Sequence, residues 1–242
     1  IKKSRTDKTI SSNHIRSIKE DNFGNLWIGT YDGGLNILNK KSGKINVSKN
    51  DPNEPNSIGS NQVQDILVES DSVYWIGTFG GGLNKVSVNG NPNNQKLIFK
   101  KYKHDKNDPQ SISDNRVYKL FRSRDGGFWI GTYGGGLNSF DPKSGKFNSY
   151  PANSGIDDKF NNENLMTIHE DYEGTLWLGS YGGSLTSFDR KTEKLKRYSF
   201  REGLTSGVVY GILEDDSKNL WISSDDGIFR LNIKTKEINR YD

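Results

Sequence analysis

The chain has 242 residues, of which 31% are hydrophobic and 26% are charged, and its formal net charge is +4. This length is enough for one large domain, and because no run of 18 apolar residues occurs, no segment is expected to span a membrane. The absence of cysteine excludes disulfides and thiol chemistry. Most Lys and Arg residues are spread along the chain, which favours a solvated surface over a nucleic-acid site.

Near the N-terminus, residues 13–50 read as four short strands joined by tight turns. The expected strands contain Ile15 and Ile18 and then cover residues 26–28, 35–38 and 44–49. The second is an apolar run typical of a strand buried on both faces. Glycines at 33–34 favour a turn before the third strand, because glycine accepts positive φ at little steric cost. We name these strands a, b, c and d, from the inside of the expected ring outward.

The same pattern returns along the chain, and each of the five tryptophans marks one copy of strand b. They are Trp27, Trp75, Trp129, Trp177 and Trp221, at spacings of 48, 54, 48 and 44 residues. A period of about 40–50 residues built from short strands is typical of a β-propeller blade. One blade cannot bury its own faces, so the tryptophans are expected in a core between stacked blades. We therefore predict an all-β fold of five four-stranded antiparallel blades.

The limits of the blades follow from this register. Residues 1–12 are interpreted as the outer strand and loop of a preceding blade, and the blades as residues 13–60, 61–114, 115–162, 163–206 and 207–242. Because residues 1–4 resemble a strand d and the chain starts with Ile1, we expect a piece of a larger propeller of more than five blades. A closed five-blade ring, or an open arc completed by another chain, remains an alternative.

Two local features accompany each repeat. Apolar residues stand twelve and nine positions before each tryptophan, an odd step that breaks the period-2 alternation of a strand and suggests a bulge or a strong local twist in strand a. Glu-Asp pairs at 20–21, 170–171 and 214–215 stand at the turns between strands a and b. Consecutive strand residues point to opposite faces, so these pairs favour Asx turns over an acid–base site.

The repeats resemble those of the two-component regulator propeller family. The first copy matches that pattern at Asn13, Ile18, Glu20, Asp21, Gly24, Leu26, residues 27–30 and residues 33–36. The resemblance implies the periplasmic sensor region of a membrane-bound hybrid histidine kinase, which captures a glycan or oligosaccharide signal and relays it to the kinase. It implies no catalytic residue, metal or cofactor in this segment, and contact with a membrane only through a downstream segment.

A binding site is expected on the face that carries the d–a and b–c loops of every blade. An aromatic residue follows each of four tryptophans by four positions, and aromatic rings with polar neighbours suit the C–H faces of sugars. The candidates are the b–c residues Tyr31, Asp32, Phe79, Tyr133, Tyr181 and Asp225, and the residues His14, Gln62 and Arg116 at the start of strand a. The alternative is that the rings wedge between blades. Arg116 could bind an acidic sugar or pair with Asp114.

Two other classes of function stay open. A propeller lyase would need a general base, usually His, and often a metal, but His14, His104 and His169 show no metal-ligand spacing. A structural or protein-docking segment would have no ligand of its own. Its partner would be a second copy of the chain or a neighbouring propeller, and no nucleic acid is expected as a partner.

Overall fold

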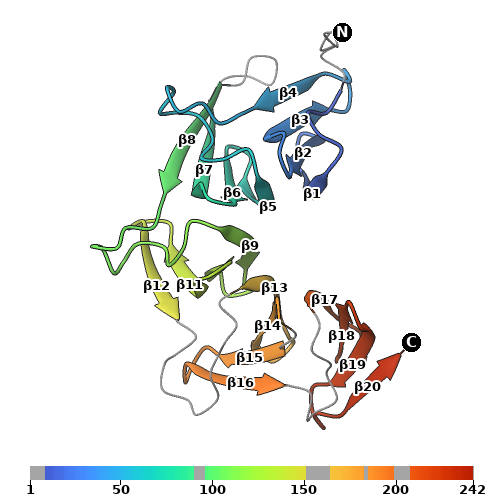
Figure 1. Cartoon of the computed structure of the whole chain (residues 1–242). Helices are drawn as coiled ribbons and strands as arrows, with labels where there is room; N and C mark the ends of the chain where they lie inside the picture. Colours follow the sequence, from blue (N-terminus) through green and yellow to red (C-terminus); the bar gives the residue numbers. More distant parts are fainter. Residues whose placement is uncertain (1–8, 90–95, 151–163, 183–184, 199–207, 242) are drawn as a thin grey trace. The chain divides into compact units, whose positions relative to one another are not determined.

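The structure is a computed structural model that describes residues 9–89, 96–150, 164–182, 185–198 and 208–241. Every regular element in these residues is a β-strand, and the strands form five four-stranded antiparallel sheets (Figure 1). Each sheet contains one tryptophan in its second strand, as the all-β propeller prediction requires. The outer strand expected at residues 1–4 lies outside the described residues.

In all five sheets, strands that are consecutive in the chain are neighbours in space, so each sheet is a simple meander. The first sheet consists of β1 (Ile15–Glu20), β2 (Asn25–Thr30), β3 (Leu35–Asn39) and β4 (Ile45–Ser48). The second consists of β5 (Val63–Ser70), β6 (Val73–Thr78), β7 (Gly82–Asn89) and β8 (Lys96–Tyr102). The third consists of β9 (Val117–Arg122), β10 (Phe128–Thr132), β11 (Gly136–Asp141) and β12 (Lys146–Tyr150).

The last two sheets repeat this meander. The fourth consists of β13 (Leu165–Glu170), β14 (Leu176–Ser180), β15 (Leu185–Asp189) and β16 (Lys194–Tyr198). The fifth consists of β17 (Val209–Glu214), β18 (Asn219–Ser224), β19 (Gly227–Asn232) and β20 (Ile238–Tyr241). The chain divides into two compact units, Ile1–Leu120 and Phe121–Asp242, and each is described by itself.

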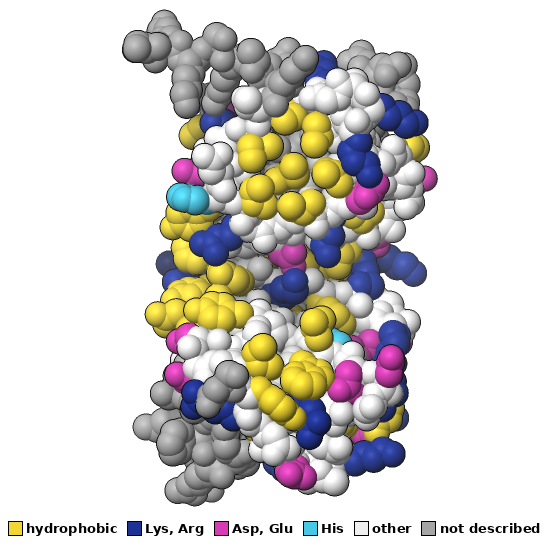
Figure 2. All heavy atoms as spheres, turned by 90° about the vertical axis from the view of Figure 1, so that its right-hand side faces the viewer, with side chains coloured by type: hydrophobic (Ala, Val, Ile, Leu, Met, Phe, Trp, Pro, Cys, Tyr) yellow, Lys and Arg dark blue, Asp and Glu magenta, His cyan; other side chains and the backbone are white. Residues whose placement is uncertain are grey.

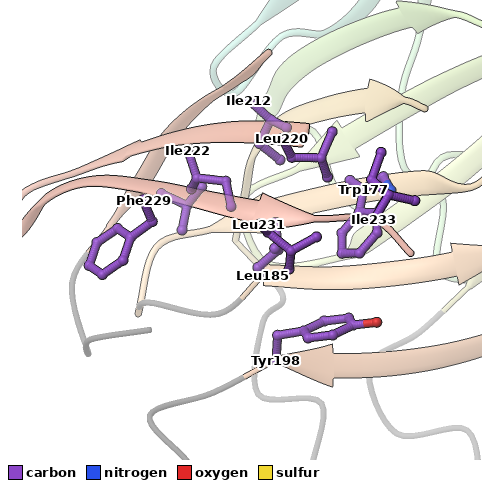
Figure 3. Packing of buried hydrophobic residues seen from close by; sticks show 10 residues of the cluster. Trp177, Leu185, Tyr198, Ile212, Leu220, Ile222, Phe229, Leu231 and Ile233 are labelled. Atoms are coloured by element: carbon purple, nitrogen blue, oxygen red, sulfur yellow. The ribbon is translucent and has the colours of Figure 1, made fainter. Parts of the chain in front are cut away.

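The hydrophobic core lies between consecutive blades, where the tryptophans were predicted. In the first unit Trp27 of blade 1 stacks on Tyr74 of blade 2, with ring centroids 3.7 Å apart. Ile66 of β5 belongs to the same buried cluster. In the second unit Trp177 of blade 4 shares a cluster with Ile212 and Leu231 of blade 5 (Figure 3). Strand a of blade 2 and strand a of blade 5 are therefore buried by the tryptophan-bearing face of the blade before them.

The glycine after each Trp-Ile or Trp-Leu pair allows this close approach. A Cβ atom added to Gly29 would lie 2.6 Å from Cγ1 of Val63, and one added to Gly77 would lie 2.8 Å from Cγ1 of Val117. Gly179 is in the same position against Val209. Blade 5 has Ser223 in place of this glycine, and Ser223 is exposed.

Each indole N–H has a side-chain acceptor six residues earlier. The Nε1 atoms of Trp27, Trp177 and Trp221 donate to Asp21, Asp171 and Asp215 at 3.0, 2.7 and 2.8 Å. Trp75 donates to Glu69, and Trp129 donates to Ser123 at 3.3 Å. The same aspartates accept backbone N–H groups of the following turn. The predicted Asx turns are confirmed, and these turns also fix the orientation of the buried tryptophans.

The predicted irregularity of strand a is present. The pairing of strands a and b shifts register between Ile15 and Ser17 in blade 1 and between Val63 and Asp65 in blade 2. The same shift occurs in blades 4 and 5. A bulge at this point turns the next side chain and explains the odd step between the two apolar positions.

The first blade leaves its strand a uncovered. Ile15 and Ile18 are 43% and 51% exposed, whereas the corresponding Val63 and Ile66 of blade 2 are 0% and 1% exposed. In blade 5 the exposed large hydrophobic side chains are Tyr210, Leu213, Ile228 and Tyr241. Figure 2 shows several hydrophobic side chains exposed on the face that it presents. Apolar surface of this kind is typical of contact sites.

Replacing Gly77 with Ala should lower the free energy of unfolding by about 1–3 kcal/mol, because the added methyl group overlaps Val117 in a packed core. The matched control is Ser223→Ala, which should change stability by less than about 0.5 kcal/mol because Ser223 is exposed. Urea unfolding followed by tryptophan fluorescence measures both. Equal effects of the two variants would contradict the proposed reason for the glycine.

A second pair of variants compares the same position in two blades. Ile66→Ala should cost about 2–5 kcal/mol, since it opens a cavity between blades 1 and 2. Ile18→Ala should cost less than about 1 kcal/mol, because half of that side chain is already in solvent. Thermal unfolding of the two variants gives the comparison. A loss for Ile18→Ala as large as that for Ile66→Ala would show that this face is covered in solution.

Candidate functional site

A polar pocket lies in the first unit, where blades 1 and 2 meet on the side of the d–a and b–c loops. It has a volume of about 400 Å³, which is within the range of small-molecule sites. The pocket is lined by Asp32, Asn50, Gly59, Ser60, Asn61, Gln62, Phe79 and Gly80. Three of these residues, Asp32, Gln62 and Phe79, are among the candidates that the sequence predicts.

The d–a loop between blades 1 and 2 forms one wall and is held by its own side chains. The Nδ2 of Asn50 donates to the carbonyl of Ile58 at 2.7 Å, and the backbone N–H of Asn50 donates to Oδ1 of Asn61 at 2.8 Å. The N–H of Gly59 donates to Oδ1 of Asn84 at 2.8 Å. Asn84 is fully buried in β7, so the loop is anchored directly to the sheet beneath it.

The b–c turns form the opposite wall and are joined to this loop by backbone hydrogen bonds. The N–H of Gly34 in blade 1 donates to the carbonyl of Asn61, and the N–H of Phe79 in blade 2 donates to the carbonyl of Gln62, both at 2.9 Å. The pocket is therefore built from two consecutive blades. Because its backbone is fixed on both sides, the polar side chains that line it are held close to one another.

Asp32 occupies a turn that differs from the b–c turns of the other blades. The corresponding Gly80, Gly134 and Gly182 have φ values of +86°, +116° and +108°, in the region that favours glycine. Asp32 has a negative φ. Its side chain is exposed and lines the pocket. The presence of Asp32 in place of glycine is therefore accompanied by a change of φ from positive to negative at this position of the turn.

Tyr31 and His14 lie together beside this turn but do not line the pocket. Their rings meet edge to face with centroids 6.4 Å apart, and the guanidinium of Arg16 lies 5.0 Å from the centre of the Tyr31 ring. The sequence did not single out Arg16. Its place next to a candidate aromatic depends on the strand a bulge, which changes the direction of that side chain.

Arg116 pairs with Asp114, one of the two alternatives left open by the sequence. Its Nε and Nη2 atoms donate to the two carboxylate oxygens of Asp114 at 2.8 and 2.7 Å. Burial opposes ionisation of Asp114, but the hydrogen bonds from Arg116 outweigh it and hold the pKa of this carboxyl below its usual value. The charge of Arg116 is thus compensated within its own loop.

The remaining candidates lie in the second unit. Tyr133 and Tyr181 of consecutive blades have ring centroids 6.1 Å apart, at an angle of 58°. Tyr181 is exposed and Tyr133 is half-buried, so these rings form part of the surface rather than a buried wedge. Asp225 accepts the backbone N–H of Val208 at 2.5 Å. It holds the start of strand a in blade 5 and so has a local structural contact.

The d–a loop residues that complete the pocket were not among the site residues predicted from the sequence. These are Asn50, Gly59, Ser60 and Asn61, with Gly80 of the following turn. The available signal was the similarity of residues 50–61 to residues 104–115, two loops of equal length that both end in Ser-Ile-x-x-Asn. In the second loop Asn115 Oδ1 accepts the N–H of His104 at 2.8 Å, which matches the bond between Asn61 and Asn50.

The described residues contain no group of three or more His, Asp or Glu side chains placed to hold a metal ion. His169 is not among the residues that line the pocket, and its Nε2 atom lies 3.7 Å from Oε2 of Glu214. Burial lowers the pKa of His169, and the nearby carboxylate of Glu214 only partly opposes this effect. No helix in the described part of the chain is long and apolar enough to cross a membrane.

The profile of a family described as "two component regulator propeller" matches residues 9–32, 111–134 and 203–226. Three segments of the chain, one each at the start of blades 1, 3 and 5, thus match the two-component regulator propeller repeat. No curated protein sequence matches the chain. The matched segments end at the b–c turns of blades 1, 3 and 5, so each of these regulator propeller repeats includes a candidate b–c residue: Tyr31, Tyr133 and Asp225.

Solved structures with the same fold include two extracellular domains from B. thetaiotaomicron. One belongs to a protein described as a one component system, with 21% identity and a TM-score of 0.75 over 99% of this chain and 31% of that chain. The other belongs to a hybrid two component system, with 23% identity and a TM-score of 0.58 over 96% of this chain and 35% of that chain. This chain thus spans about a third of the length of these structures.

An enzyme-like propeller has a similar fold. A protein of Bacteroides uniformis described as a 6-phosphogluconolactonase has 13% identity and a TM-score of 0.59, over 92% of this chain and 68% of that chain. At such identities the likeness concerns the fold alone. The residues of the pocket, and not the fold, must therefore carry the functional argument.

The pair of Asp114 and Arg116 gives a pH-dependent test of the loop. Because the folded-state pKa of Asp114 is lowered, its contribution to stability should be complete above the unfolded-state pKa near 3.8 and be lost as the pH falls through the folded-state value. Asp114→Asn should therefore cost on the order of 1 kcal/mol at pH 7 and much less near pH 3. Urea unfolding between pH 3 and 7 measures the difference.

The control for this test is the same comparison in an Arg116→Gln background. There the cost of Asp114→Asn at pH 7 should be smaller, because the guanidinium is the main partner of the carboxylate. A cost that stays constant between pH 3 and 7 in the wild-type background would contradict the assignment.

Proposed function

We propose that this chain is part of the extracytoplasmic, periplasmic sensor region of a hybrid two-component system, and that it binds an oligosaccharide in the pocket between blades 1 and 2. The regulator propeller repeats support the signalling context. So does the likeness to extracellular domains of one-component and hybrid two-component systems. A histidine kinase that receives the signal would lie outside these 242 residues.

The observation that carries the proposal is the composition of the pocket. The Phe79 ring supplies an aromatic surface beside the hydroxyl of Ser60, the amides of Asn61 and Gln62, and the carboxylate of Asp32. Sugars present C–H groups on their ring faces and hydroxyl groups at their edges, so an aromatic wall with convergent polar groups fits them. An apolar ligand would leave these polar groups without partners, which costs free energy.

Binding can be coupled to a signal because the pocket spans two blades. A ligand that contacts Asp32 of blade 1 and Phe79 of blade 2 would stabilise the blade arrangement that holds both at the required distance. A relay needs two states with different affinities for the ligand. The boundary between blades 1 and 2 is where such a difference would arise in this proposal.

We infer that this segment is not catalytic. Asp32 is the one ionisable side chain that lines the pocket among the described residues. General acid–base chemistry usually relies on a positioned proton donor and acceptor, and the other lining groups are amides, a hydroxyl, glycines and a phenyl ring. A lyase would instead need a base such as His169, which pairs with Glu214 elsewhere in the fold.

A protein-docking role is the second candidate, and one observation favours it. Ile15 and Ile18 are exposed on strand a of blade 1, at positions that are buried by a neighbouring blade in the rest of the chain. A neighbouring propeller or a second copy of the chain would gain apolar contact there. Sensing and docking would use different parts of blade 1, so the two roles are compatible.

The test is a thermal-shift screen of the chain against oligosaccharides, followed by titration of the best ligand. A ligand at about 100 times its dissociation constant should add about 2.7 kcal/mol of stability. Phe79→Ala and Gln62→Ala should each weaken binding by about ten-fold, since they remove the aromatic wall and a lining amide. Tyr210→Ala, an exposed aromatic outside the pocket, is the matched control and should bind as the wild type does.

Circular dichroism at the binding temperature shows whether each variant remains folded. If saccharides bind equally well to the wild type and to both pocket variants, the site lies elsewhere. If none of them stabilises the folded wild type, the docking role becomes the better account of this segment.

A further inference from the structure

We propose that the pocket selects oligosaccharides by charge, with Asp32 as the residue that determines this specificity. Saccharides with free amino groups should bind best, neutral ones less well and acidic ones worst. This inference rests on the proposed function, because it concerns the ligand of the same pocket. It differs from the suggestion in the sequence that Arg116 binds an acidic sugar.

The Asp32 carboxylate stabilises no turn or ion pair within the described residues. Aspartates at other turns accept backbone N–H groups: Asp21 accepts those of Phe23 and Asn25, and Asp114 accepts that of Arg116. The Asp32 side chain makes no hydrogen bond or ion pair with any described residue. Its oxygens are therefore available to a ligand, although an exposed carboxylate must exchange water for that contact.

The b–c turn of blade 1 does not require an acidic residue at position 32. Blade 2 makes the corresponding turn with Gly80, and the adjoining Gly81 and Gly82 are shared with blade 1 as Gly33 and Gly34. Asp32 adopts a negative φ that is open to any residue. The carboxylate thus adds a charge to the pocket that the local fold could dispense with.

None of the residues that line the pocket carries a positive charge that could compensate the Asp32 carboxylate. The two equivalent loops differ here: Asp114 and Arg116 in the loop 104–115 and just after it correspond to the neutral Ser60 and Gln62. Arg116 is already paired with Asp114. A carboxylate or sulfate group in the pocket would therefore meet the negative charge of Asp32 without a partner, and an ammonium group would meet a free counter-charge.

Three oligosaccharides of equal length and linkage test this ordering: β-1,4-linked hexamers of glucosamine, glucose and glucuronic acid. Isothermal titration at pH 6 should give about five-fold tighter binding of the glucosamine hexamer than of the glucose hexamer, the effect expected of a partly exposed ion pair. The glucuronic acid hexamer should bind more weakly than either. The difference should shrink when the salt concentration rises from about 20 to 500 mM.

The decisive variant is Asp32→Asn, which keeps the size and hydrogen-bonding capacity of the side chain and removes its charge. It should reduce the preference for glucosamine to less than two-fold, with the affinity for the glucose hexamer changed little. Asp32→Gly introduces the glycine that blades 2, 3 and 4 have at this position and should likewise remove the preference. Because Asp32 is exposed, both variants should unfold at nearly the wild-type temperature.

Phe79→Ala shows whether the measured binding takes place in the pocket. The net charge of the chain is +4, so non-specific attraction would favour the acidic hexamer, in the opposite direction to the proposal. If the hexamers bind with sensitivity to Phe79→Ala but with equal affinity, or if Asp32→Asn keeps the preference, the charge selection is wrong and the proposed function stands. If no hexamer binds while another oligosaccharide stabilises the chain with sensitivity to Phe79→Ala, the charge selection is wrong and the proposed function stands; if no oligosaccharide binds at all, both fail.

Discussion

The structure depends on one packing constraint: a blade can bury its strand a only against the tryptophan-bearing face of the blade before it. Ile66 meets the face that carries Trp27, and Ile212 meets the face that carries Trp177. The approach is close enough that Gly77 has no room for a side chain against Val117. Such a core is made of many small contacts at close range, so it fixes the identity of the residues at its centre.

This constraint also explains why each tryptophan comes with a polar acceptor. A buried indole N–H without a partner would oppose the packing, and the acceptor six residues earlier removes this cost. The acceptor lies in the a–b turn, where an aspartate such as Asp21 also organises the backbone. The side chains at the a–b end of each blade therefore serve to stabilise the turn and the buried tryptophan.

The opposite end of the blades is less constrained by the core and more varied in chemistry. Its d–a loops are anchored by a few asparagines, such as Asn61 and Asn84, and the side chains between the anchors are free to differ. The result is visible in two loops of the same length: one carries an internal ion pair, Asp114 with Arg116, and the other borders an open polar pocket. A propeller built from such blades could vary the side chains at this end without altering its core.

The sequence by itself determined the blades, the place of every tryptophan and the Asx turns, because each is set by local patterns repeated at a fixed period. It indicated an irregularity in strand a, which the structure shows as a register shift against strand b. It also indicated Asp32, Gln62 and Phe79 as members of a site. It left open whether Arg116 pairs with Asp114 or binds a ligand, and it did not predict that residues of the loop 50–61 line the pocket. Only the tertiary structure decided these, because hydrogen bonds such as that from Gly59 to Asn84 join segments 25 residues apart, and no periodic pattern records them.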